Sequence, residues 1–126
     1  MADTISLNGV RALVVEDSWQ VANAITRLAE NTGMVVIGPA ATVAEAEQLL
    51  LTLTPDVAII DINLRGEMAY GLIERLHEKG VPIVVTTGYD AFPHVKDKAA
   101  AILTKPFRAA SLFNHLRRII AARSTG

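Results

Sequence analysis

The chain has 126 residues, 51% of them hydrophobic and 20% charged, which suits one compact domain and excludes a disordered or fibrous class. Its formal net charge of −1 argues against direct binding to nucleic acid, and the absence of cysteine excludes disulfides and thiolate metal sites. No apolar run approaches the ~20 residues of a membrane-spanning helix and no charged-then-apolar leader opens the sequence, so we expect an intracellular, cytoplasmic protein with no membrane partner.

Five apolar runs of strand length alternate with segments whose apolar residues recur at helical spacing. This is the pattern of repeated β-α-β units, and it predicts an α/β fold with a buried parallel sheet and helices on both faces. The predicted strands are Arg11 to Glu16, Val35 to Gly38 or slightly beyond, Val57 to Ile60, Ile83 to Thr86 and Ala101 to Leu103. We expect a single domain over residues 1–126, with a folded core of about 9–123 and loose ends.

Two helices are predicted in the first half of the chain. The first spans about residues 18–31 and stops at Gly33; its inward residues should be Val21, Ile25, Leu28 and Ala29. The sequence from Thr42 to Glu45 has the form of a capping box that opens the second helix, which ends near Pro55. The residues that this second helix should bury are Ala46, Leu49, Leu50 and Leu53.

The second half of the chain begins with a continuously apolar strand that ends in Asp61. Turn residues at 63–66 predict a loop, and Gly80 closes the third helix. Pro93 allows only a short fourth helix, and the last helix should span about residues 108–122. The apolar positions of the third and last helices are Ala69, Leu72, Ile73, Leu76, Leu112, Leu116, Ile119 and Ile120.

Several apolar strands are followed at once by polar residues. Glu16 and Asp17 follow the first strand, and Asp61 follows the third. Thr87 and Lys105 follow the fourth and fifth, and the carboxyl ends of parallel strands meet at one edge of a sheet. Three crowded carboxylates repel one another unless a cation is present, and oxygen ligands suit Mg²⁺. The pattern predicts a divalent cation with a lysine beside it, which together could hold a phosphoryl group.

The chain resembles the receiver domain of two-component response regulators over nearly its whole length. The matching pieces, in order, are residues 14–17 (VVED), 55–61 (PDVAIID), 82–88 (PIVVTTG) and 103–107 (LTKPF). Thr87-Gly88-Tyr89 is similar to the Thr-Gly-Tyr part of a subgroup of stand-alone, single-domain receivers. The resemblance implies a flavodoxin-like fold with strand order 2-1-3-4-5.

The resemblance also implies a role for each of the polar residues. Asp61 would accept a phosphoryl group from a phosphohistidine on a sensor histidine kinase or histidine phosphotransfer protein, without the chain being an enzyme. Asp17 and Asp61 would bind Mg²⁺ directly, Glu16 through water, and Asn63 through its backbone carbonyl. Lys105 would stabilise charge on the transferred group, and Thr87 would hydrogen-bond the group once attached.

Three further positions concern switching. The position three residues before the lysine, aromatic in many receivers, is Ile102 here, so Tyr89 is a candidate for part of the switch. The resemblance implies a cis peptide before Pro106, which would aim Lys105 into the site. The side chains of Asn63 and Tyr89 are candidates for setting the lifetime of the acyl phosphate.

The sequence fits two other functions less well than that of a receiver. A Mg²⁺-dependent phosphatase of the haloacid dehalogenase type needs a second carboxylate two residues after the nucleophile, where Asn63 stands. A nucleotide or flavin module needs a glycine-rich loop after the first strand, where residues 16–19 are Glu-Asp-Ser-Trp. A receiver scaffold that binds proteins without phosphorylation remains open, as do a phosphate sink, a phosphate shuttle and direct binding to a downstream protein target. Because the chain ends soon after the last helix, we expect no output domain in it.

Some other titratable residues have structural interpretations and are not expected in the site. His77, His94 and His115 lack metal-ligand spacing and are expected on the surface. Arg123, with Arg117 and Arg118, should complement the dipole of the last helix, and Asp56 should be a turn or cap residue. The predicted site residues are therefore those at the strand ends and at the switch positions.

Overall fold

The structure is a computed structural model that describes residues 5–88 and 93–125. Its main sheet has five strands, all paired in parallel, in the order β2-β1-β3-β6-β7. This is the order 2-1-3-4-5 expected for a flavodoxin-like fold. The strands are β1 (Arg11–Val15), β2 (Val35–Ala40), β3 (Val57–Asp61), β6 (Ile83–Thr87) and β7 (Ala101–Thr104).

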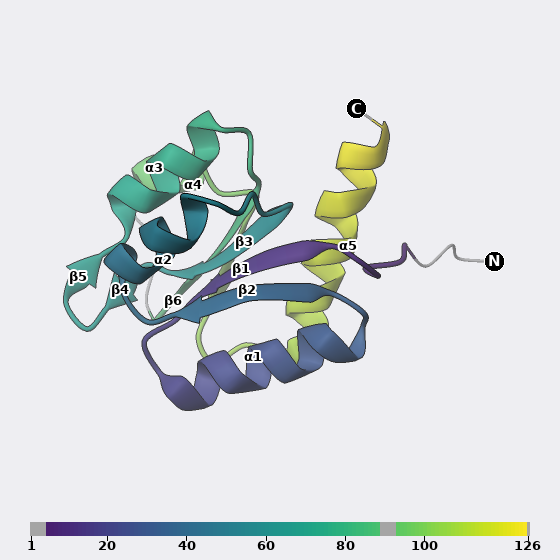
Figure 1. The fold of residues 1–126 in the computed structure, drawn as a ribbon, viewed down its shortest axis with the longest axis horizontal. Helices are drawn as coiled ribbons and strands as arrows, with labels where there is room; N and C mark the ends of the chain where they lie inside the picture. The colour runs from purple at the N-terminus through teal and green to yellow at the C-terminus, as the bar shows by residue number, and fades with distance from the viewer. Residues whose placement is uncertain (1–4, 89–92, 126) are drawn as a thin grey trace.

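Helices cover both faces of the sheet, as the alternating pattern predicts (Figure 1). The helices are α1 (Trp19–Asn31), α2 (Val43–Leu50), α3 (Tyr70–Glu78), α4 (Pro93–Lys96) and α5 (Ala109–Thr125). Helices α1 and α5 pack on one face, and α2, α3 and α4 pack on the other. None of the helices within the described ranges is long and apolar enough to cross a membrane.

The sheet separates two hydrophobic cores because successive side chains of a strand point to opposite faces. Strand β3 shows this most clearly, since all five of its residues are buried. Ala58 and Ile60 belong to the core beneath α2 and α3, whereas Val57 and Ile59 belong to the core beneath α1 and α5. A central parallel strand covered on both sides needs a continuous apolar run, which is why β3 lacks polar residues until Asp61.

The predicted helix starts are correct, but two predicted core residues are wrong. Ser18 caps α1 by accepting a hydrogen bond from the backbone of Val21, and Thr42 caps α2 by accepting one from Glu45. Leu28 is 40% exposed because it lies at the edge of the apolar stripe of α1, where Ala22 is buried instead. Leu53 is 39% exposed because α2 ends at Leu50, before Leu53 could return to the buried face.

The segment predicted as a loop after β3 is a short antiparallel hairpin. Strand β4 (Asn63–Leu64) pairs with β5 (Glu67–Met68) through a two-residue turn. Both turn residues have positive φ, 55° at Arg65 and 91° at Gly66, as in the type I′ turn that matches the twist of a hairpin. A glycine adopts this backbone freely, whereas an arginine does so rarely. The hairpin lies directly beside the carboxyl end of β3 (Figure 1).

The last helix is longer than predicted and its end is anchored. The prediction placed residues 124–126 in a loose tail, but α5 continues to Thr125. Arg123 donates a hydrogen bond to the backbone carbonyl of Asp56 and lies 3.8 Å from its carboxylate. Asp56 also accepts a hydrogen bond from the backbone of Arg11 at 2.8 Å. Arg123 therefore ties α5 to the amino ends of β1 and β3, beyond the dipole role expected of it.

The packing of α5 gives a test of the fold. Leu116 is fully buried between α5 and the sheet, so Leu116→Ala should lower the free energy of unfolding by about 2–5 kcal/mol through lost burial and a residual cavity. Leu51→Ala is the matched control, because Leu51 is 73% exposed and its truncation should change stability by less than about 0.5 kcal/mol. Urea denaturation followed by circular dichroism measures both. Equal effects of the two substitutions would contradict this placement of α5.

Candidate functional site

The strand register brings the predicted site residues to one edge of the sheet. Val15 lies opposite Ile60, so Glu16 follows β1 at the level where Asp61 ends β3. Asp61 lies opposite Thr86, and Thr87 lies opposite Thr104. The backbone of Lys105 donates a 2.7 Å hydrogen bond to the carbonyl of Thr87. Residues separated by up to 89 positions in the chain thus become neighbours through strand pairing alone.

Three carboxylates form a cluster at this edge. One oxygen from each of Glu16, Asp17 and Asp61 lies within 4.8 Å of the others. Glu16 and Asp61 are buried, and the side chain of Asp17 is 20% exposed, so the cluster opens to solvent on the Asp17 side. The donor set consists of oxygen atoms only, which fits a hard divalent cation such as Mg²⁺ and does not suit a soft metal.

Lys105 supplies the positive charge nearest to the two buried carboxylates. Its Nζ donates to Glu16 Oε1 at 2.9 Å and to Asp61 Oδ2 at 2.8 Å. These are charge-assisted hydrogen bonds in a partly buried setting, where they are stronger than in water. Lys105 therefore bridges the ends of β1 and β3 from its position after β7.

Backbone donors hold the second oxygen of each of these carboxylates. Glu16 Oε2 accepts a hydrogen bond from the backbone of Ser18 at 3.0 Å, and Asp61 Oδ1 accepts one from the backbone of Asn63 at 3.1 Å. The first contact belongs to the turn that starts α1, and the second to the turn that starts the hairpin. The local chain direction after each strand thus orients the carboxylate at its end.

Burial and charge shift two pKa values in the cluster. Burial raises the pKa of Glu16, and the negative charge of Asp61 adds to this, against the opposing hydrogen bonds from Ser18 and Lys105. Burial alone would lower the pKa of Lys105, but its hydrogen bonds to Asp61 and Glu16 and their negative charges raise it above its ordinary value of 10.5. Lys105 accordingly remains a cation at neutral pH, and the cluster carries excess negative charge beside it.

A fifth charged residue, absent from the predicted site residues, joins the site from the hairpin. Arg65 Nε lies 3.5 Å from Asp17 Oδ2, and the side chain of Arg65 is 80% exposed. The sequence signal was the Arg-Gly pair between Asn63-Leu64 and Glu67-Met68, which can be interpreted as a two-residue hairpin turn as well as a loop. Only the folded hairpin shows that this turn carries its cation to the carboxylate after β1.

The remaining predicted residues occupy varied places. Thr87 is fully buried at the end of β6, and Ile102 is half-buried opposite Val85. The side-chain oxygen of Asn63 accepts a 2.6 Å hydrogen bond from the backbone of Gly66, so it is engaged in the hairpin turn. The Lys105–Pro106 bond is cis, as the resemblance implied, and so is Gly38–Pro39, which was not predicted. Tyr89 lies outside the described residues.

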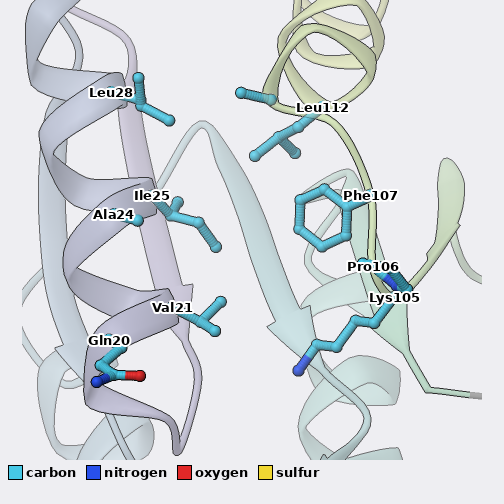
Figure 2. Close-up of a pocket in the computed structure, with 10 residues that line it drawn as sticks. Gln20, Val21, Ala24, Ile25, Leu28, Lys105, Pro106, Phe107 and Leu112 are labelled. Atoms are coloured by element: carbon cyan, nitrogen blue, oxygen red, sulfur yellow. The ribbon is translucent and has the colours of Figure 1, made fainter.

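An apolar groove of about 600 Å³ adjoins the cluster. Figure 2 shows Val21, Ile25 and Leu28 of α1 on one side of it, and Phe107 and Leu112 on the other. Lys105 lies at one end of the groove and donates hydrogen bonds to the carboxylate cluster.

Comparisons with known proteins agree with this fold. The family model of the response regulator receiver domain matches residues 12–117. A CheY-like receiver domain from Methylobacillus flagellatus is 26% identical, with a TM-score of 0.78 over 89% of this chain and 99% of that one. SdrG from Sphingomonas melonis Fr1 is 28% identical, with a TM-score of 0.76 over 89% and 97% of the two chains.

A third structure, a CheY-like receiver domain protein from Methanospirillum hungatei JF-1, is 23% identical, with a TM-score of 0.82 over 94% of this chain and 100% of that one, and shows the shared fold. None of the curated proteins compared with the chain matches it. The similarity of this chain to known proteins therefore rests on the family model and the solved structures.

The role of Lys105 in the cluster can be tested through stability. Lys105→Met should lower the free energy of unfolding at pH 7 by about 1–3 kcal/mol, because two buried carboxylates lose their charged donor. Since the folded-state pKa of Lys105 lies above 10.5, its contribution is fully present below that pH and is lost as pH rises through the folded-state value. Urea denaturation of both proteins from pH 7 to 11.5 should show a constant difference that shrinks only at the alkaline end.

Two outcomes would contradict this account of Lys105. One is equal stability of wild type and Lys105→Met at pH 7. The other is a difference that grows above pH 10.5, which would give the opposite sign for the pKa shift.

Proposed function

The chain belongs to the family of response regulator receiver domains, a family of signalling domains that are generally not enzymes, and we propose that Asp61 is its phosphoacceptor. The observation that supports this best is the placement of Asp61 at the end of β3, within one cluster with Glu16 and Asp17 and 2.8 Å from Lys105. An acidic residue that must act as a nucleophile toward phosphorus needs neighbouring positive charge. The site offers one fixed cation and a donor set for another.

The carboxylate cluster is proposed to hold Mg²⁺. Asp17 and Asp61 would bind the ion directly, Glu16 through water, and Asn63 through its backbone carbonyl. When bound, Mg²⁺ would neutralise part of the charge on a transferred phosphoryl group. The donor chemistry of the cluster supports this assignment, since all three side chains offer oxygen atoms.

The phosphoryl group is proposed to come from a phosphohistidine of a sensor histidine kinase or a histidine phosphotransfer protein. A carboxylate oxygen of Asp61 would form the new bond to phosphorus while the bond from phosphorus to the imidazole nitrogen breaks, and the imidazole keeps the electron pair. Lys105 would then hold charge on the oxygens of the phosphoryl group. Its present hydrogen bonds place its Nζ at the reacting carboxylate before the donor arrives.

Switching is proposed to follow from the new contacts of the acyl phosphate. Thr87 would hydrogen-bond the phosphoryl group and draw in the backbone after β6. Thr87 accepts the backbone hydrogen bond of Lys105 and follows the residue paired with Asp61, so a displacement at Thr87 would affect β7 and its surroundings. Ile102 stands at a position that is aromatic in many receivers. Another side chain would therefore take over that part of the switch, and Tyr89 is the candidate.

The pathway role of the domain remains a prediction. We propose a phosphorelay step in the cytoplasm, with output to a downstream protein target. The complete set of acidic, hydroxyl and lysine groups favours this role. A phosphate sink or shuttle would use the same chemistry, whereas an unphosphorylated scaffold would need none of it. A phosphatase is disfavoured because Asn63 stands where that class requires a carboxylate.

Phosphorylation can be tested with a small-molecule donor. Incubation with acetyl phosphate and Mg²⁺ should add one phosphoryl group, seen by intact mass, and hydroxylamine should remove it because the product is an acyl phosphate. Asp61→Asn and chelation of Mg²⁺ with EDTA should each abolish the addition. Asp56→Asn is the matched control at the opposite end of β3 and should be phosphorylated as wild type is. Equal labelling of Asp61→Asn and wild type would disprove the proposal.

A further inference from the structure

The turn between β4 and β5 holds the backbone of Arg65 in a fixed place. Asn63 pairs with Met68 and Leu64 with Glu67, and the side chain of Asn63 accepts a hydrogen bond from the backbone of Gly66. Leu64 is buried in the core beneath α2 and α3, and this contact anchors the hairpin. Glu67 Oε1 accepts a hydrogen bond from the backbone of Val43 at 3.3 Å, which ties the hairpin to the start of α2.

The local energetics of this turn do not favour an arginine. Arg65 has φ of 55°, a conformation that glycine or asparagine adopts at lower cost. Its ion pair with Asp17 is long at 3.5 Å, and its side chain is 80% exposed, so the pair contributes little to folding. What the residue does supply is a positive charge on the solvent-open side of the carboxylate cluster.

We propose that Arg65 is a counter-ion that competes with the divalent cation for Asp17 and so sets the affinity of the cluster for Mg²⁺. This rests on the proposed function only in taking Asp17 as a ligand of the ion. Mg²⁺ must either displace the guanidinium from Asp17 or bind a few ångströms from it, and both oppose binding. The position of Arg65 on a fastened turn keeps this opposing charge close to the site even when its side chain moves.

Lys105 and Arg65 have different roles because their surroundings differ. Lys105 is 28% exposed and is held by two buried carboxylates, so it stays in the cluster when other charges enter. Among residues 5–88 and 93–125, Arg65 has one charged partner, and its side chain faces solvent, so it can leave Asp17 at small cost. Lys105 is therefore the cation that stays paired with the cluster when Mg²⁺ binds, and Arg65 is the cation that Mg²⁺ can displace.

The experiment compares Mg²⁺ binding by wild type, Arg65→Asn and Arg65→Lys, with isothermal titration calorimetry and the fluorescence of Trp19, the first residue of α1, as readouts. Asparagine suits the left-handed turn, so Arg65→Asn removes the charge without adding backbone strain. It should bind Mg²⁺ about three- to tenfold more tightly at low ionic strength. Arg65→Lys should stay within about twofold of wild type, and the gain of Arg65→Asn should shrink at about 0.5 M NaCl, where charges are screened.

Arg75→Gln serves as the matched control, because it removes one positive charge from an exposed ion pair with Glu47 that lies outside the cluster. It should leave Mg²⁺ affinity within about twofold of wild type. Equal or weaker Mg²⁺ binding by Arg65→Asn would overturn the inference, as would a gain that Arg65→Lys or Arg75→Gln shares or that salt does not reduce.

The same proteins separate this inference from the proposed function. Tighter Mg²⁺ binding by Arg65→Asn together with no phosphorylation of Asp61 by acetyl phosphate would support the inference and contradict the proposed function. Phosphorylation of Asp61 with no effect of Arg65→Asn on Mg²⁺ affinity would do the reverse. A wild-type protein that binds no Mg²⁺ would contradict both.

Discussion

Repulsion among three carboxylates at one edge of the sheet is the constraint on which the site depends. Glu16 and Asp61 are buried, and each would be costly as an anion without a counter-charge. Lys105 meets this need by hydrogen bonds to both, and backbone groups of the following turns bind the remaining oxygens. Since these partners come from the ends of β1, β3 and β7, the charge balance exists only while the strand register holds.

The same balance gives the site its chemistry. A cluster that carries more negative than positive charge suits a divalent cation, and in the proposed function that cation and Lys105 would together hold a phosphoryl group. The proposed addition of that group to Asp61 would change the local charge near the end of β6, where Thr87 is fully buried. Such a change in charge beside a buried residue would be the physical basis for a switch.

The hairpin after β3 adds a second cation of a different character. Its pairing, its buried Leu64 and the contact of Glu67 with α2 fix the backbone, whereas the side chain of Arg65 is exposed to solvent and paired with Asp17. The site is therefore bounded by a partly buried lysine on one side and an exposed arginine on its solvent-open side. The first pairs with both buried carboxylates, and the second is the residue that we propose opposes the binding of Mg²⁺.

The five strands of the main sheet, their order along the chain and the polar residues at their ends could be predicted from the amino-acid sequence, because burial on both faces demands continuous apolar runs and the acidic, hydroxyl and lysine groups stand out after them. Contacts of residues away from those strand ends follow only from the folded chain. The hairpin turn that brings Arg65 to Asp17, the exposure of Leu28 and Leu53, and the tie between Arg123 and Asp56 depend on packing between distant segments. Periodicity reports whether a residue faces a core, but contacts across the edge of a sheet are set by register and turn geometry, which local sequence specifies weakly.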